Sequence, residues 1–278
     1  MADPTPPSPG PVPAALPLAE FDAEAGLIAP RPPRGVAAGA WRAAVLCFFP
    51  EVLAALEVSG RGRRVAEFSG DSGGGAILEV DTDHGPVVAL HPGVGAPLAA
   101  LHLEVLVAAG VRDVVACGGA GAVRPGLVLG HVVVPTAALR DEGTSHHYRP
   151  PGRIVTTDPD VAAHLVAVLE RHGIPHTRGL TWTTDAPFRE TAGRIARRRA
   201  EGCLTVEMET AALAAVCAFR GARFGQFLYA ADDVSGPVWD HRAWTRAEVR
   251  EVLFELAVEA VSTLAPAVRT SGDGRAGA

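Results

Sequence analysis

The chain has 278 residues, with 25 Lys and Arg against 31 Asp and Glu, a formal net charge of −6, and 48% hydrophobic residues. This negative balance argues against a dedicated nucleic-acid-binding protein, which needs a basic surface to neutralise phosphates. We expect no membrane association either, because no apolar run reaches the ~18 residues of a membrane-spanning helix. The apolar content is sufficient for one large domain around a single core.

The two ends of the chain differ in composition from the rest. Residues 1–18 are Pro-rich and residues 270–278 are rich in small and polar residues, so we expect a single domain over residues 19–269 between two disordered tails. The N-terminus has neither a basic start nor a continuous apolar core, so we expect no signal peptide and a cytoplasmic protein. Four widely spaced cysteines are expected to be reduced and buried: Cys47, Cys117, Cys203 and Cys217.

Between the tails, the pattern alternates strands with helices. Short apolar or β-branched runs predict strands at residues 43–49, 65–68, 77–80, 87–90, 114–117, 132–135, 178–183 and 223–230. Longer helical stretches, several of them bounded by Pro or Gly, are predicted at residues 97–109, 158–172, 207–220 and 245–264. In the last helix, Thr245 and Glu248 are predicted to form a capping box. This order of elements predicts a three-layer α/β fold.

A pair of carboxylates is the first candidate for chemistry. In the segment LTVEMETAA at residues 204–212, Glu207 and Glu209 flank Met208 at the expected start of a helix. A single Glu there has an ordinary explanation, a favourable contact with the helix dipole. Two carboxylates two residues apart on a helix cannot share a face, so each needs its own partner. Because sugar hydroxyls are good donors to ionised carboxylates, we interpret the segment as a sugar-binding site.

A glycine-rich loop is the second candidate. The segment VVACGGAGAV at residues 114–123 is a buried strand that runs into a loop with Gly118 and Gly119. Ligands of open α/β sheets collect at the carboxyl ends of strands, where Gly lets them approach the backbone. The segment HPGVGAP at residues 91–97 leads similarly from a strand into a helix. Neither segment matches a dinucleotide or Walker pattern, so we expect no nucleotide cofactor.

Two aspartates are the third candidate. In YAADDVSG, at residues 229–236, Asp232 and Asp233 follow an apolar strand, where they are suited to ligand contact or acid–base catalysis. The alternative is a turn with an Asx cap, given the Ser-Gly that follows. That alternative applies more to Asp233 than to Asp232.

In this order, the three segments resemble the nucleoside phosphorylase superfamily, which includes uridine phosphorylase, hexameric purine nucleoside phosphorylase and methylthioadenosine/S-adenosylhomocysteine nucleosidase. The resemblance covers residues 43–264, and its most specific part is the VEME segment followed by an apolar strand that ends in Asp. The segment RDEGTSHHY at residues 140–148 looks like the uridine phosphorylase branch, whereas Asp232 lies where the purine-acting branches keep a catalytic Asp. The resemblance implies a three-layer αβα sandwich around a mixed, largely parallel sheet, assembled as a homo-oligomer such as a dimer or hexamer.

The resemblance also implies roles for single residues. Met208 and Glu209 would hold the ribose, and Asp232 would protonate the departing base. Phe188 would stack on the base, and Arg189 nearby would read a base carbonyl. Cleavage of this kind requires stabilisation of the departing negative charge and of an oxocarbenium-like sugar.

The usual phosphate ligands of the phosphorylases are missing. Their GDPxR loop is replaced by CFFPEV at residues 47–52, and three further ligand positions hold residues without a charge or hydroxyl, namely Ala66, Ala116 and Gly119. A phosphate dianion cannot be desolvated without charge partners. Phosphate is kept as an alternative co-substrate because other cations are candidate substitutes: Arg140, Arg189 and the pair Arg31 and Arg34.

Glu51 matches the nucleosidase branch, which also lacks those arginines and holds a water-activating Glu in its first strand–helix loop. The ordinary alternative is an exposed Glu in the first turn of a helix. With Glu209 and Asp232, Glu51 would complete a hydrolytic set. The uracil-reading Gln and Arg of uridine phosphorylase fall on Thr191 and Gly193, so uridine is not favoured. We therefore predict N-glycosidic cleavage of a nucleoside, with purine favoured over pyrimidine and water slightly over phosphate.

Two alternatives stay open: phosphorolysis with relocated cations, and a nucleoside-binding relative repurposed for specialised metabolism. We predict no metal, because the adjacent His146 and His147 are poorly placed to share one. Residues 239–244 (WDHRAW) are predicted either to fold over the pocket or to pack the final helix. The arginines of residues 197–199 are predicted to form a solvated helix face.

Overall fold

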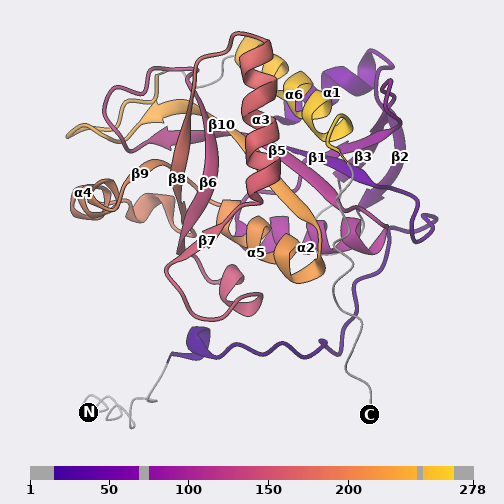
Figure 1. Ribbon diagram of the computed structural model, residues 1–278, viewed down its shortest axis with the longest axis horizontal. Coiled ribbons are helices and arrows are strands. Elements are labelled where there is room, and N and C mark those ends of the chain that lie inside the picture. The colour runs from indigo at the N-terminus through magenta and orange to yellow at the C-terminus, as the bar shows by residue number, and fades with distance from the viewer. Residues whose placement is uncertain (1–15, 69–74, 243–246, 266–278) are drawn as a thin grey trace, which may run out of the picture.

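A ten-stranded mixed sheet lies at the centre of the protein (Figure 1). It is seen in a computed structural model whose described residues are 16–68, 75–242 and 247–265. The strands are β1 (Ala43–Cys47), β2 (Arg63–Phe68), β3 (Gly75–Val80), β4 (Val87–Leu90), β5 (Asp113–Ala122), β6 (Val132–Asp141), β7 (Ile154–Thr156), β8 (His176–Thr184), β9 (Cys203–Glu207) and β10 (Arg223–Asp233). They lie in the order β10-β6-β8-β9-β5-β1-β4-β3-β2, with β7 beside β6.

One half of this sheet closes on itself. Because β5 pairs with β10 as well as with β9, the strands β5, β10, β6, β8 and β9 form a ring, from which β1, β4, β3 and β2 extend. The strands β4, β1, β5 and β10 are joined by parallel pairings. Antiparallel pairings occur between β2, β3 and β4 and where β6 meets β10 and β9 meets β5. The carboxyl ends of four parallel strands therefore meet at one edge.

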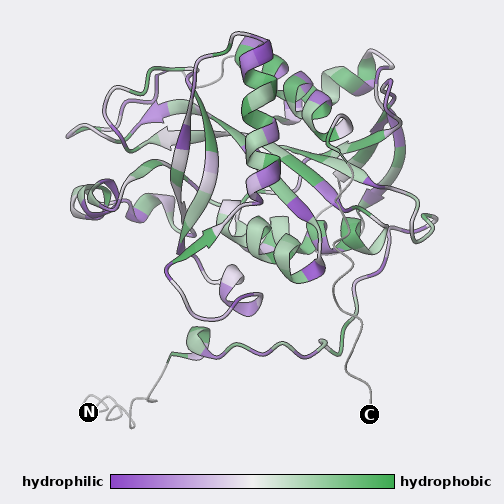
Figure 2. Cartoon of the chain, viewed as in Figure 1, coloured by the Kyte–Doolittle hydropathy of each residue, from purple (hydrophilic) through white to green (hydrophobic). Residues whose placement is uncertain are grey.

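Helices cover both faces of the sheet, which gives the three layers. The described helices are α1 (Pro50–Val58), α2 (Ala96–Ala108), α3 (Pro159–Arg171), α4 (Ala192–Ala200), α5 (Thr210–Arg220) and α6 (Ala247–Ser262), with short 3-10 turns η1 (Pro17–Ala19), η2 (Thr144–His147) and η3 (Pro187–Arg189). One core packs α1, α3 and α6 against the sheet, and a second packs α2 and α5. In Figure 2, α2, α5 and the middle of the sheet are predominantly apolar, as buried layers require.

This architecture confirms the αβα sandwich around a mixed sheet that the sequence predicted. The helix predicted from Glu207 begins instead at Thr210, because the all-buried residues Cys203–Glu207 form β9 between β8 and β5. The arginines of α4 were predicted to be solvated, and for Arg198 this is wrong. Its side chain is 10% exposed and paired with Asp141.

Other expectations concern the chain ends, the cysteines and membrane-spanning helices. Leu16, the N-cap residue of η1, and Leu18 within η1 are exposed. Residues 1–15, the tail at residues 270–278 and the predicted N-cap Thr245 lie outside the described residues. All four cysteines are free and buried. In the described part of the chain, no helix is both long and apolar enough to cross a bilayer.

Close packing between α3 and β10 leads to a stability prediction. A Cβ atom on Gly225 would lie 2.6 Å from Val161 Cγ1 and 2.9 Å from Leu165 Cδ1. Gly225→Ala is therefore expected to lower the free energy of unfolding by about 1–3 kcal/mol through overpacking. The matched control is Gly193→Ala on α4, where the nearest atom is 3.7 Å away. Equal denaturation midpoints for Gly225→Ala and wild type would contradict this account of the α3–β10 contact.

Candidate active site

The carboxyl ends of the parallel strands bring the predicted residues together from distant parts of the sequence. Glu51 follows β1, Gly118 and Gly119 lie in the second half of β5, and Asp232 lies at the end of β10. The end of β9 adds Glu207, since Val206 pairs with Gly121 of β5. The edge at which these strands end is therefore the candidate active site.

Glu207 and Glu209 have different surroundings, as their spacing predicted. The Glu207 carboxylate accepts hydrogen bonds from the Thr183 hydroxyl at 2.6 Å and from the backbone N–H groups of Glu209 and Thr210 at 2.7 and 2.6 Å. It therefore caps the first turn of α5 from the end of β9. Glu209 is the N-cap residue of α5, and its Oε1 accepts the N–H of Gly95 at 2.6 Å. Both side chains are buried.

The carboxyl groups of Glu207 and Glu209 are close enough for the ionisation of one to disfavour the ionisation of the other. Burial raises the pKa of Glu207, and its three hydrogen bonds oppose that rise. Burial and the charge of Glu207 raise the pKa of Glu209 to about 8. Because Glu207 has more donors, we assign the charge to it and the proton to Glu209 near pH 7. Met208, between them, is half-buried.

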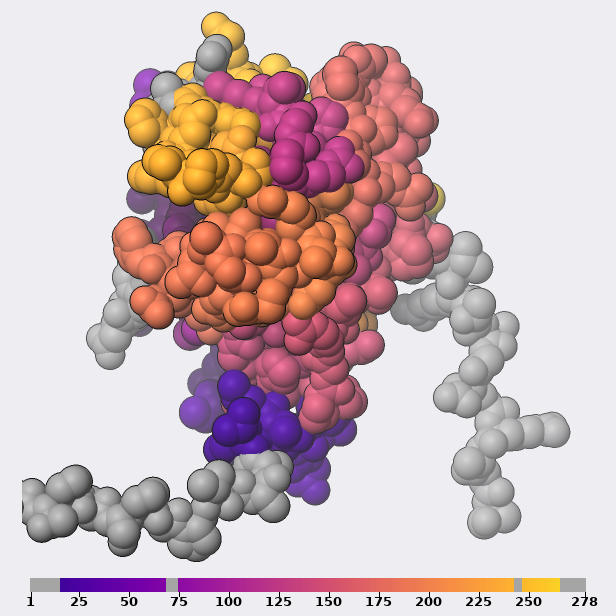
Figure 3. Space-filling model, turned by 90° about the vertical axis from the view of Figure 1, so that its left-hand side faces the viewer, coloured from indigo at the N-terminus to yellow at the C-terminus, as the bar shows by residue number. Residues whose placement is uncertain are grey.

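Asp232 lies under a loop that folds back over the end of β10. Its Oδ2 accepts the indole N–H of Trp239 at 2.7 Å, and burial raises its pKa despite this bond. Asp233 holds the base of the same loop through an ion pair with Arg242, which also donates to the carbonyl of Leu127 at 2.7 Å. In Figure 3, the gold surface of residues 234–242 lies beside a magenta surface.

The contacts of this loop show the role of Asp233 and the position of the WDHRAW segment. Asp233 is a turn-forming residue, because its Oδ1 accepts the N–H of Ser235 at 2.7 Å and its pKa is lowered by hydrogen bonds from Ser235 and the charge of Arg242. The described part of the WDHRAW segment folds over the site, since Trp239 bonds to Asp232. Trp239 is 59% exposed and Phe188 of η3 is fully exposed, so both aromatic faces are open to a ligand.

Glu190 was not predicted from the sequence. Burial raises its pKa to about 7, and Coulombic repulsion from Asp232 adds to the rise. Two half-buried carboxyl groups thus share the region where the resemblance puts the base. Only the fold brings β10 and the turn after β8 together, so no local signal identified Glu190.

Glu51 is paired with a cationic side chain. Its Oε1 accepts from Nη1 of Arg250, a residue of α6 that sequence reasoning missed. The hydrogen bond and charge of Arg250 hold the pKa of Glu51 below its usual range, against the effect of partial burial. The Glu51 side chain is 47% exposed, whereas that of Arg250 is 15% exposed. Glu51 is therefore an accessible, ionised carboxylate.

The predicted glycine-rich loop is wrong: Gly118 and Gly119 lie within β5, because its pairing with β10 continues to Ala122. A Cβ atom at Gly118 would lie 3.3 Å from the Phe48 ring, and one at Gly119 would lie 3.2 Å from Ala231 Cβ and 3.3 Å from the Tyr229 ring. Ala116 is completely buried. This part of β5 therefore brings no charged side chain to the site.

The predicted arginines lie in different settings. Arg140 is buried and supports the loop after β6: its guanidinium donates to the Ser145 hydroxyl at 2.8 Å and to three backbone carbonyls, those of Arg149, Pro150 and Gly152. The guanidinium therefore supports this loop, while the backbone of Arg140 pairs with Thr183 of β8, whose hydroxyl donates to Glu207. Arg189 is exposed on η3, next to Phe188.

His146 and His147 lie on η2, half-buried and exposed respectively. Among the described residues, no cluster of three or more His, Cys, Asp or Glu side chains is arranged to hold a metal ion.

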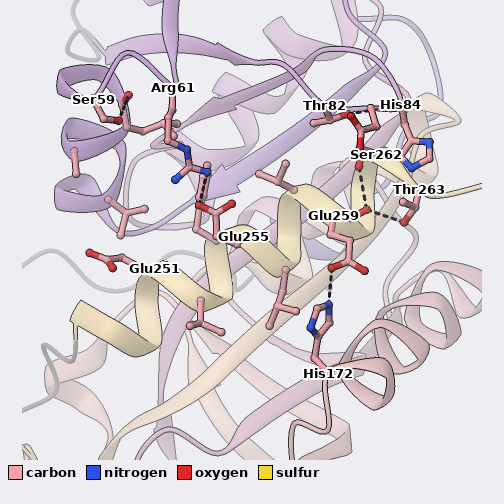
Figure 4. Close-up of a pocket in the computed structure, with 18 of the residues that line it drawn as sticks. Ser59, Arg61, Thr82, His84, His172, Glu251, Glu255, Glu259, Ser262 and Thr263 are labelled. Carbon is pink, nitrogen blue, oxygen red and sulfur yellow. Dashed lines mark hydrogen bonds and ion pairs between the residues drawn. The ribbon is translucent and has the colours of Figure 1, made fainter.

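A separate groove of about 850 Å³ lies beside α6 (Figure 4). Its walls come from α1, α6, the turn after β3 and the end of α3, and its charged groups include the ion pairs Arg61–Glu255 and His172–Glu259. The residues that line it include none of the predicted site residues. The hollow is therefore distinct from the carboxylate-rich edge of the sheet.

Comparisons with known proteins identify the family of the chain. Residues 42–264 match the family model described as the phosphorylase superfamily. The uridine phosphorylase of Escherichia coli (strain K12) is 30% identical over 159 residues, which cover 52% of this chain and 63% of that protein. The guanosine phosphorylase of Halorubrum lacusprofundi is 29% identical over 149 residues, covering 54% and 62%. The chain thus spans less than two thirds of the length of these curated relatives.

Proposed function

Because this chain belongs to the phosphorylase superfamily, as the match over residues 42–264 shows, we propose that it cleaves the N-glycosidic bond of a nucleoside and releases the free base. The observation that carries the proposal is the convergence of Glu209, Asp232 and Glu51 at one edge of the sheet. Glu209 supplies an acceptor for the ribose hydroxyls. Asp232 supplies the acid that protonates the departing nucleobase, and Glu51 supplies the general base that accepts a proton from the attacking nucleophile.

The proposed reaction uses water as the nucleophile. Glu51 accepts a proton from water as the oxygen bonds to C1′ of the sugar. The bond between C1′ and the base nitrogen breaks, and Asp232 donates its proton to the departing base. The pKa of Asp232, raised by burial, favours the protonated form that this step needs. Glu209 accepts hydrogen bonds from the ribose hydroxyls, and Met208 packs beside the sugar.

Charge supports water over phosphate as the nucleophile. Ala116 and Gly119 of β5 bring no charge to the site, and Ala66 offers none on β2. Arg250 is a cation close to Glu51, but that carboxylate neutralises it. A phosphate dianion there would meet a net charge of zero, whereas water needs only the ionised Glu51.

A purine is the proposed base. Protonated Asp232 is a hydrogen-bond donor of the kind a purine ring nitrogen accepts, and the exposed faces of Phe188 and Trp239 suit a bicyclic ring. The second candidate is a phosphate-dependent nucleoside phosphorylase, favoured by the similarity of the chain to uridine and guanosine phosphorylases. In that case Arg250 would have to exchange Glu51 for phosphate.

Base release from a panel of purine and pyrimidine nucleosides tests this proposal, with free base measured by chromatography. The expected result is release from purine nucleosides well above release from uridine. A preference for uridine would overturn the purine assignment, and no release from any nucleoside would overturn N-glycosidic cleavage.

Glu190 makes a prediction about pH dependence. Burial and the charge of Asp232 raise the pKa of Glu190 to about 7, so Glu190 gains a second negative charge beside Asp232 as pH rises through 7. Glu190→Gln stays neutral at every pH, so an inflection of the wild-type kcat/KM profile near pH 7 is expected to be absent from the variant. The control is Glu24→Gln on the exposed N-terminal segment. A Glu190→Gln profile that keeps the inflection near pH 7 would show that it does not come from Glu190.

A further inference from the structure

Arg250 is held by three contacts, one from β10 and two from the start of α1. Its Nε donates to the Tyr229 hydroxyl of β10 at 3.0 Å, and its Nη1 donates to Glu51 in the first turn of α1. Its guanidinium also lies 5.2 Å from the ring centre of Phe49, the N-cap residue of α1. A guanidinium fixed on three sides loses little further freedom when it orients a carboxylate.

The groups that face Glu51 come from three directions. Arg250 faces it from α6, His91 from the end of β4, and the Tyr229 hydroxyl lies beyond Arg250 on β10. Burial lowers the pKa of His91 and raises that of Tyr229, so both are neutral at pH 7. Arg250 therefore has the largest effect of these groups on the ionisation of Glu51, and the charge of His91 adds a smaller effect at acidic pH, where His91 is protonated.

We propose that Arg250 is the positioning residue of the water-activating carboxylate: anchored by Tyr229 and Phe49, it orients Glu51 and keeps it ionised. This inference rests on the proposed hydrolytic function. The Nη1 contact is to Oε1, so Oε2 is the oxygen assigned to the attacking water. The alternative role, direct binding of an anionic co-substrate by Arg250, gives a different result in the experiment below.

The experiment measures kcat/KM for base release against pH in phosphate-free buffer. Without Arg250 the pKa of Glu51 rises, so more of the carboxylate is protonated at mildly acidic pH. For Arg250→Met, the acid limb is expected to move to higher pH by roughly one unit, and kcat at pH 7 to fall roughly tenfold because the carboxylate loses its orientation. Arg250→Lys restores the charge, so its acid limb should lie close to the wild-type position.

Arg61→Met is the matched control. Arg61 forms a comparable ion pair with Glu255 of the same helix, at 2.8 Å, but lies in the separate groove of Figure 4. Its acid limb should equal that of wild type. An acid limb in Arg250→Met that also equals that of wild type, in a folded protein, would overturn the proposal.

A double-mutant cycle with Glu51→Gln separates the two roles of Arg250. A positioning residue acts through Glu51, so Arg250→Met should change kcat by less than about twofold in the Glu51→Gln background. A phosphate ligand would instead lose phosphate-dependent activity in both backgrounds, which would overturn the proposal. The wild type assayed without phosphate tests the proposed function itself: if it releases no base, hydrolysis fails, independently of the role of Arg250.

Discussion

Asp232→Asn should lower kcat by about 10²–10⁴-fold while nucleoside binding is retained. The amide has the shape of the carboxyl group and can still accept the indole N–H of Trp239, but it has no proton to give to the departing base. The loss should therefore appear in the chemical step. Burial raises the pKa of Asp232, which marks it as a group prepared to carry a proton.

Steady-state kinetics and equilibrium binding of a purine nucleoside would separate these effects. Asp160→Asn is the control, because Asp160 is an exposed residue in the first turn of α3. An Asp232→Asn enzyme with wild-type kcat would remove Asp232 from the reaction. A variant that no longer binds the nucleoside would instead assign Asp232 to ground-state binding.

Above pH 8, where Glu209 is ionised, Glu209→Ala should lower kcat/KM by roughly 10²–10³-fold, because two hydrogen bonds from ribose hydroxyls to a charged acceptor are lost. The wild type should also show a pH-dependent KM. Its Glu209 has a pKa of about 8, raised by burial and by Glu207, and ribose hydroxyls donate best to the ionised form. KM is therefore expected to fall as pH rises towards 8.

Glu209→Gln is the informative partner variant, since its amide oxygen can still accept the N–H of Gly95. It should fold normally, bind weakly and show a KM that no longer changes between pH 6 and 9. Glu170→Ala, an exposed change on α3, controls for general effects of removing a carboxylate. A Glu209→Ala enzyme with unchanged kcat/KM would show that this carboxylate does not contact the sugar.

The sequence predicted the layers because their signals are local. Buried apolar runs identified β1, β5 and β6, and helix boundaries at Pro and Gly identified α2 and α3. The start of α5 was misplaced because β9 is short and followed after two residues by the helix, so that its buried run reads as part of a helix. The closure of the sheet into a ring has no local signal, since it depends on pairing between β5 and β10.

Part of the candidate site could be identified from local signals. Glu207 and Glu209 were singled out at the expected start of a helix, and Asp232 at the end of an apolar strand, where ligand-binding side chains are expected. Arg250 and Glu190 could not be identified in this way, because they acquire their roles through interactions between distant elements, with Glu51 and Asp232 respectively. The hydrogen bonds of Arg140 to loop carbonyls also depend on tertiary structure, so no local pattern indicated that it supports this loop.

The most direct test of the hydrolytic reaction is the sugar product formed from a purine nucleoside with and without inorganic phosphate, followed by phosphorus NMR and by release of free base. Equal rates of base release in both conditions, with free sugar and no sugar 1-phosphate signal, is the result expected of a site in which Glu51 neutralises Arg250. Base release that requires phosphate, with sugar 1-phosphate accumulating in step with it, would contradict the account and assign the site to phosphorolysis.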